Sequence, residues 1–126
     1  MGITKSRDLA EKFGKDWVVH SFLPKVIENY NIDKQGYNYR MCSLNSLKVI
    51  MPFIPKEHVT QHVVPLLVKA LKDPIPNVRF TSAKVIQRQK QHIDPGVFNG
   101  QIQSVLKDLL QDTDKDVVYF ATVALN

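Results

Sequence analysis

A short segment of this chain recurs three times at a constant spacing. Residues 38–41 (Asn-Tyr-Arg-Met) align with residues 77–80 (Asn-Val-Arg-Phe) and with residues 116–119 (Asp-Val-Val-Tyr). A period of about 40 residues, with two helical patterns around a turn in each unit, is typical of a helical solenoid. The repeat therefore predicts an all-α chain of about three stacked helical hairpins.

Turn signals set the expected limits of these hairpins. Pro52 and Pro55 close the first one, and Asp94-Pro95-Gly96 opens the third. We predict the end of a preceding repeat helix at 1–14, repeats at 15–54 and 55–93, and a truncated repeat at 94–126. This is an α-α superhelix of the HEAT or armadillo kind. Because neither end shows a polar capping repeat, we expect a fragment of a longer array.

Two local expectations concern prolines and the single cysteine. Pro24 and Pro65 lie at corresponding places in the first helices of two repeats, and each removes one intrahelical hydrogen bond. A kink shared by both helices is therefore predicted. Cys42 has no partner for an internal disulfide, and its place beside Met41 predicts a buried position in the helix core.

Composition limits the class of protein and of partner. The chain has 126 residues, 44% of them hydrophobic, with no apolar stretch long enough to span a bilayer and no signal peptide, so we expect a soluble protein in the cytoplasm or also in the nucleus. The net charge of +5 is uneven, because residues 41–90 hold eight basic and two acidic side chains. Such a charge favours an acidic protein or a nucleic acid as partner.

No motif for catalysis or metal binding stands out, so we predict a non-enzyme without cofactor or metal. His58 and His62 share a helix face, but the glutamate of a zinc-protease pattern is absent. Asp112, Asp114 and Asp116 alternate like the start of a calcium loop, without its glycine and its downstream glutamate. We interpret them as turn and helix-capping residues.

The turns inside the three hairpins are the candidate binding surface. Stacking places equivalent turns on one edge, where Tyr and Arg anchor protein interfaces well. The predicted partner-binding residues are Tyr37, Asn38, Tyr39, Arg40, Pro76, Asn77, Arg79, Lys115, Asp116 and Tyr119.

The arginines among these residues allow two interpretations, whereas the tyrosines allow one. Arg40 and Arg79 either contact a partner or pair with carboxylates along the turns, since Asp73 precedes Arg79 by six residues. Tyr37 and Tyr39 are expected to be exposed, because aromatic residues two apart cannot both face one helical stripe.

Several short segments, in this order and spacing, resemble the last HEAT repeats of the scaffold (A, regulatory) subunit of protein phosphatase 2A. They are residues 12–17, 23–26, 37–41, 73–74, 77–80 and 114–120. The resemblance implies that the turns hold the phosphatase catalytic subunit, with Tyr37, Tyr39, Arg40, Asn77 and Arg79 as contacts. It also implies that the regulatory B subunit binds N-terminal repeats that this sequence lacks.

The leading hypothesis is thus a non-catalytic scaffold that docks a phosphatase. The alternative is a basic solenoid that binds nucleic acid through Lys48, Lys69, Lys72, Lys84, Arg88 and Lys90. A solenoid enzyme acting on nucleic-acid bases is the third possibility, for which Asp16 beside Trp17 is the local hint.

Overall fold

The computed structural model describes residue 14, residues 17–30 and residues 36–126. The predicted end of a preceding repeat helix at 1–14, apart from Gly14, lies outside the described residues, and so does Asp16. Gly14 has a φ of 83°, a left-handed conformation that glycine adopts readily.

Each of the three hairpins pairs a first helix with a second helix. The first hairpin comprises η1 (Val18–Phe22), α2 (Leu23–Tyr30), α3 (Gly36–Ile50) and η2 (Met51–Phe53). The second comprises α4 (Lys56–His58), η3 (Val59–Val63), α5 (Val64–Leu71), α6 (Pro76–Arg88) and η4 (Lys90–His92). The third comprises α7 (Pro95–Val97), η5 (Phe98–Ile102), α8 (Gln103–Leu109) and α9 (Lys115–Leu125).

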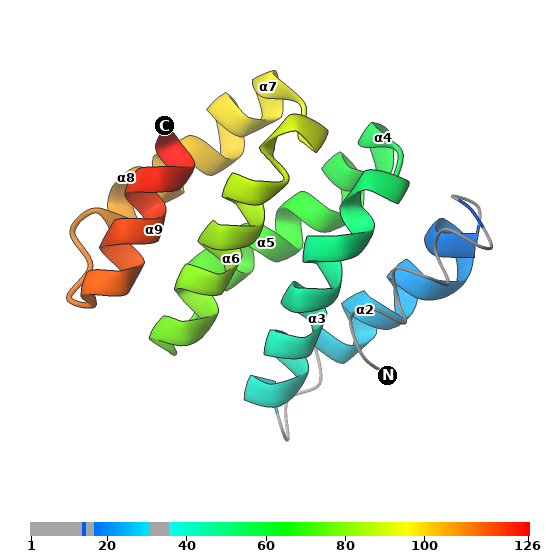
Figure 1. Cartoon of the computed structure of the whole chain (residues 1–126), viewed down its shortest axis with the longest axis horizontal. Helices are drawn as coiled ribbons and strands as arrows, with labels where there is room; N and C mark the ends of the chain where they lie inside the picture. Colours follow the sequence, from blue (N-terminus) through cyan, green and yellow to red (C-terminus); the bar gives the residue numbers. More distant parts are fainter. Residues whose placement is uncertain (1–13, 15–16, 31–35) are drawn as a thin grey trace.

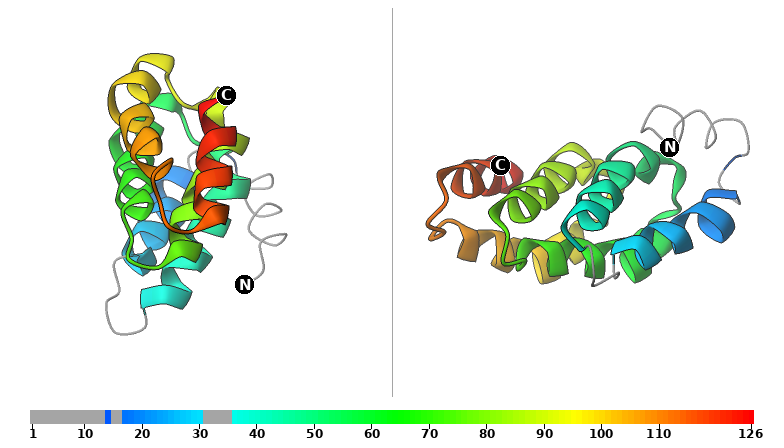
Figure 2. Two further views of the ribbon diagram at one scale, coloured as in Figure 1. Left: turned by 90° about the vertical axis from the view of Figure 1, so that its left-hand side faces the viewer. Right: turned by 90° about the horizontal axis from the view of Figure 1, so that it is seen from below.

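The hairpins stack side by side and form two layers of helices (Figures 1 and 2). We call α2, α5 and α8 the first-helix layer, and α3, α6 and α9 the second-helix layer. Within the second-helix layer, α6 packs against both α3 and α9. The part of the chain that the structure describes contains no strand, and the predicted all-α solenoid is confirmed.

None of the described helices is long and apolar enough to cross a membrane.

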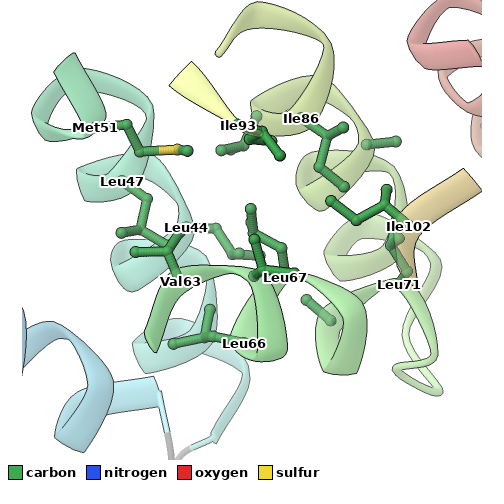
Figure 3. Close-up of a cluster of buried hydrophobic side chains, with 14 of the residues drawn as sticks. Leu44, Leu47, Met51, Val63, Leu66, Leu67, Leu71, Ile86, Ile93 and Ile102 are labelled. Carbon is green, nitrogen blue, oxygen red and sulfur yellow. The ribbon is translucent and has the colours of Figure 1, made fainter. Parts of the chain in front are cut away.

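The core lies between the two layers and is continuous from one hairpin to the next (Figure 3). Leu67 on α5 is fully buried, with Leu44 of the preceding hairpin and Ile102 of the following one in the same cluster. Because this cluster joins three hairpins, neighbouring repeats supply the burial that a single hairpin cannot provide.

A buried serine links the two helices within a hairpin. The Ser43 hydroxyl donates to the carbonyl of Val26 at 2.9 Å, and the Ser82 hydroxyl donates to the carbonyl of Leu67 at 2.8 Å. Ser82 lies one repeat after Ser43, and the next position in this series is Ala121. The first two hairpins thus share a cross-helix hydrogen bond for which the third has no hydroxyl.

The predicted distortion of the first helices occurs as a π-helical turn, but proline is not its only cause. The amide of Leu23 bonds the carbonyl of Val18, and the amide of Val64 bonds that of Val59, one residue before each proline. The third hairpin has the same turn at η5, where Ser104 takes the place of the proline. The π turn is therefore a feature of the repeat itself.

The prediction that Cys42 is buried is wrong, because the cysteine is exposed. At about 100° per residue, a position two residues before Leu44 lies on the opposite side of α3. Ser43 and Ser46 occupy the buried side instead.

Candidate functional site

The second helices all begin along one edge of the molecule, at the lower left of Figure 1. We call this edge the turn ridge and define it by residues 36–40, 73–79 and 112–116. Pro76 occupies the first turn of α6, where its missing amide proton costs no hydrogen bond. At the start of α9, Asp114 accepts hydrogen bonds from the amides of Asp116 and Val117, at 2.9 and 3.1 Å. The starts of α6 and α9 are therefore fixed by local sequence.

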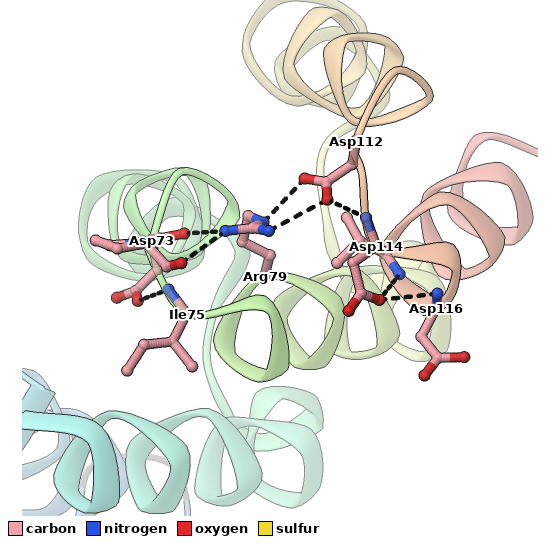
Figure 4. A network of polar contacts seen from close by, with 8 residues as sticks. Asp73, Ile75, Arg79, Asp112, Asp114 and Asp116 are labelled. Carbon is pink, nitrogen blue, oxygen red and sulfur yellow. Dashed lines mark hydrogen bonds and ion pairs between the residues drawn. The ribbon is translucent and has the colours of Figure 1, made fainter.

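Two arginine–aspartate pairs connect successive turns of the ridge. Arg40 Nε lies 2.7 Å from Asp73 Oδ2, and Arg79 Nε lies 3.0 Å from Asp112 Oδ2. In both pairs the arginine Nη2 also donates to Oδ1, and the two residues are 33 positions apart. Because each arginine lies one hairpin before its aspartate, these pairs tie each hairpin to the next. We call them the Arg–Asp ladder (Figure 4 shows the second pair).

Each ladder aspartate also shapes its own turn. The Asp73 carboxylate accepts from the amide of Ile75, and the Asp112 carboxylate accepts from the amide of Asp114, both at 2.9 Å. Such side-chain turns stabilise the chain reversal before a helix. One carboxylate thus holds a turn and binds an arginine.

Arg79 joins two turns at once, as Figure 4 shows. Its Nη1 donates to the backbone carbonyls of Asp73 and Pro74, at 2.8 and 3.0 Å, while its other nitrogens face Asp112. The interpretation that Asp73 offers Arg79 its carboxylate is wrong, since that carboxylate belongs to Arg40. Both arginines pair inside the ridge, with 21% of Arg40 and 15% of Arg79 exposed. That they contact a partner stays a prediction.

The first two turns meet through the predicted tyrosine and asparagine. The Asn77 side-chain amide donates to the Tyr37 hydroxyl at 3.0 Å, on the exposed surface of the ridge. Tyr37 is half-buried against the core and Tyr39 is half-buried as well, so neither is as exposed as expected. Asn38, beside Tyr37 in the sequence, is exposed. The hydrogen bond between Asn77 and Tyr37 therefore brings candidates of the two turns onto one surface.

The third turn contributes Lys115 and Asp116, which are both exposed. Tyr119 is 62% exposed, but it lies further along α9 and lines a groove with Lys48 and Lys84 on the second-helix layer. The structure thus separates Tyr119 from the ladder residues.

The alternating aspartates and the histidine pair have ordinary structural neighbours. Asp112 binds Arg79, and Asp114 caps α9. His58 and His62 stack with ring centroids 6.0 Å apart. Across the described ranges, no three His, Cys, Asp or Glu side chains are grouped closely enough to hold a metal ion.

Sequence reasoning missed the role of Asp112 as the partner of Arg79. The signal was present, because Asp73 and Asp112 are separated by the same repeat spacing as Arg40 and Arg79. It also missed Tyr30, which is 3% exposed and lies close enough to the first ladder pair for both of its charges to act on the hydroxyl. Burial raises the pKa of Tyr30 to about 12, with the Asp73 carboxylate adding to the rise and the Arg40 guanidinium opposing it.

Tyr30 predicts a loss of stability in strong alkali. Native Tyr30 holds its proton more tightly than unfolded tyrosine, so its contribution is complete below about pH 10 and is lost as the pH rises through 12. We expect the free energy of unfolding to fall by about 2 kcal/mol over this range, and expect Tyr30→Phe to remove that part of the fall. Urea unfolding at several pH values measures it. Tyr119→Phe, at an exposed tyrosine, should leave the pH dependence unchanged, and an equal effect of both variants would contradict the assignment.

Paired helices, a constant repeat period and a ladder that links equivalent turns define the class of protein. A family model described as HEAT repeat matches residues 63–88, inside the second hairpin. The chain is therefore an all-α HEAT-repeat solenoid.

Comparison with known proteins gives a particular resemblance within this class. The chain is 28% identical over 124 residues to the A regulatory subunit of protein phosphatase PP2A from Saccharomyces cerevisiae. The matched region covers 93% of the chain and 19% of that protein. It is 40% identical over 53 residues to the PP2A 65 kDa regulatory subunit of Drosophila melanogaster, which covers 42% of the chain and 9% of that protein. The beta isoform of the human PP2A 65 kDa regulatory subunit is 40% identical over 52 residues, with 41% and 9% covered.

These relatives confirm the resemblance predicted from the sequence. The chain spans about a fifth or less of the length of the curated relatives that it matches.

Proposed function

We propose that this chain is a non-catalytic scaffold segment whose turn ridge docks the catalytic subunit of protein phosphatase 2A. The observation that carries the proposal is the Arg–Asp ladder, which holds equivalent turns in a fixed line along one edge. A rigid line of turns presents its exposed side chains in a constant geometry, and such preorganisation lowers the entropic cost of binding. The relatives are named regulatory subunits of this phosphatase, which supports the choice of partner.

The ladder changes which residues we expect to touch the catalytic subunit. The guanidinium groups of Arg40 and Arg79 donate hydrogen bonds within the ridge. Their contribution to binding is therefore mainly to position the turns. Among the predicted contacts on the ridge, the exposed side chains remain available, and they are those of Asn38, Asn77, Lys115 and Asp116. The regulatory B subunit would then bind other repeats, which correspond to parts of the relatives that this chain does not match.

Binding of the chain to purified phosphatase 2A catalytic subunit, measured by calorimetry, tests the proposal. We expect Asn38→Ala combined with Lys115→Ala to weaken binding about tenfold, because truncating most interface residues costs less than about 1 kcal/mol each and a tenfold change corresponds to about 1.4 kcal/mol in total. The matched control is Gln101→Ala with Lys107→Ala, two exposed positions on η5 and α8. Equal effects of the two pairs, or no binding by a chain with a normal helical circular-dichroism spectrum, would refute docking on the ridge.

A further inference from the structure

A groove on the second-helix layer lies apart from the turn ridge. It encloses about 410 Å³ and crosses α6 from α3 to α9. Its lining residues are Lys48, Lys84, Gln87, Arg88, Tyr119, Phe120 and Val123.

The groove is strongly basic, and its layer offers almost no acidic side chain to balance it. Neither α3 nor α6 contains Asp or Glu, and α9 has Asp116 alone, in its first turn. Within the described residues, Lys48 and Arg88 form no ion pair. Unbalanced charges in a concave surface attract an oppositely charged ligand and concentrate it there.

Aromatic rings give the groove an ordered apolar part. Phe80 and Phe120 have ring centroids 5.7 Å apart, and Tyr119 meets Phe120 edge to face at 5.0 Å. The Lys84 ammonium lies 4.6 Å from the Phe120 ring centre and 5.6 Å from that of Phe80, so a cation is held above these rings. Tyr119 remains 62% exposed, and it is the large hydrophobic side chain most open to solvent among the residues that the structure describes.

We propose that this groove binds an acidic protein segment that carries an aromatic or apolar residue. Lys48 and Arg88 face the carboxylates of the segment, and Tyr119 packs against its apolar side chain. The site is independent of phosphatase docking, because it lies on the helix faces and uses none of the ladder residues.

The distribution of cations favours a peptide over a nucleic acid. Lys69 on α5 and Lys72 just after it belong to the first-helix layer. Lys90 donates to the backbone carbonyl of Ala124 at 3.2 Å and lies 4.4 Å from the Phe98 ring centre. Of the six basic residues named for nucleic-acid binding, the three that remain are Lys48, Lys84 and Arg88. They form a compact cluster in the groove. A nucleic-acid strand needs a longer track of phosphate contacts than this cluster provides.

Binding of a dye-labelled peptide, measured by fluorescence anisotropy, tests the proposal. The peptide has one tryptophan with two glutamates before it and two after it. We expect Lys48→Glu with Arg88→Glu to weaken binding to the whole chain at least about tenfold, since opposite charges become like charges. Tyr119→Ala should weaken it about fivefold, and so should replacement of the peptide tryptophan by glycine. The control pair is Lys56→Glu with Lys107→Glu, which changes the net charge equally at exposed positions on α4 and α8. It should change binding less than about twofold.

The opposite results would overturn the proposal. Equal losses in the two charge-reversal pairs would mean that only the overall charge attracts the peptide. Failure of a correctly folded chain to bind the peptide would refute the site directly. A third outcome would assign the groove to nucleic acid. In that case the chain would not bind the peptide but would bind a single-stranded oligothymidine, and Lys48→Glu with Arg88→Glu would abolish this binding.

Discussion

Replacing Leu67 with alanine should lower the free energy of unfolding by about 3 to 4 kcal/mol, the largest effect that we expect from a single side chain. Leu67 has no exposed surface and lies in the cluster that joins three hairpins (Figure 3). Truncating such a leucine removes its burial and leaves a cavity, and each of these adds to the cost. Small domains are stable by about 5 to 15 kcal/mol, so this change removes a large part of the total.

Urea unfolding followed by circular dichroism measures the change, and Leu110→Ala is its matched control. Leu110 has the same chemistry but is half-buried at the edge of the core, so the same truncation should cost about half as much. A Leu67→Ala chain as stable as Leu110→Ala would show that α5 does not occupy the centre of the core.

Replacing Asp112 with alanine is expected to cost about 2 kcal/mol. The change removes the partner of the Arg79 guanidinium, whose side chain is only 15% exposed, and the acceptor for the amide of Asp114. Exposed ion pairs contribute about 1 kcal/mol or less and breaking buried ones costs about 3 to 5 kcal/mol, so a partly buried pair falls between these values.

Three further variants separate the contributions of Asp112. Asp112→Asn keeps an oxygen for the amide of Asp114 but loses the charge, so it should be less harmful than alanine. Arg79→Ala combined with Asp112→Ala should cost about 1 kcal/mol less than the sum of the single changes, because the two side chains interact directly. Asp108→Ala, at an exposed position on α8, should stay within about 0.5 kcal/mol of the parent. Thermal or urea unfolding of all the variants measures these costs. Equal losses of stability in Asp112→Ala and Asp108→Ala would contradict a stabilising role of the ladder.

The repeat period made the fold predictable. Helical patterns around the turns at 73–77 and 112–116 predict second helices close to the observed α6 and α9, because prolines and capping aspartates mark their starts. The π turns were harder to predict from the sequence, because two of the three first helices have a proline that seemed to explain any distortion. The position of Cys42 was misjudged because its apolar neighbours were considered without the angle around the helix.

The candidate site was predictable as a location more than as a set of contacts. The alignment of the three repeats indicated the turns, and the structure does place Asn38, Asn77 and Lys115 at their exposed edge. The ladder was missed because its partners are 33 positions apart, whereas a carboxylate within the same turn seemed the nearer partner. The groove beside Tyr119 depends on three helices from different hairpins, and side chains from such distant segments are brought together only by the stacking angle of the solenoid.

The serine of the second helices has a consequence for how the molecule opens. Ser43 and Ser82 each tie their hairpin together, and the position that follows in the series is Ala121. The ladder shows the same trend, since Val118 occupies the place that Arg40 and Arg79 hold in the earlier hairpins. Transient local unfolding begins where the fewest polar links must break. Helices α8 and α9 should therefore separate from each other more often than α5 and α6 do, and the amide protons of the third hairpin should exchange with solvent sooner.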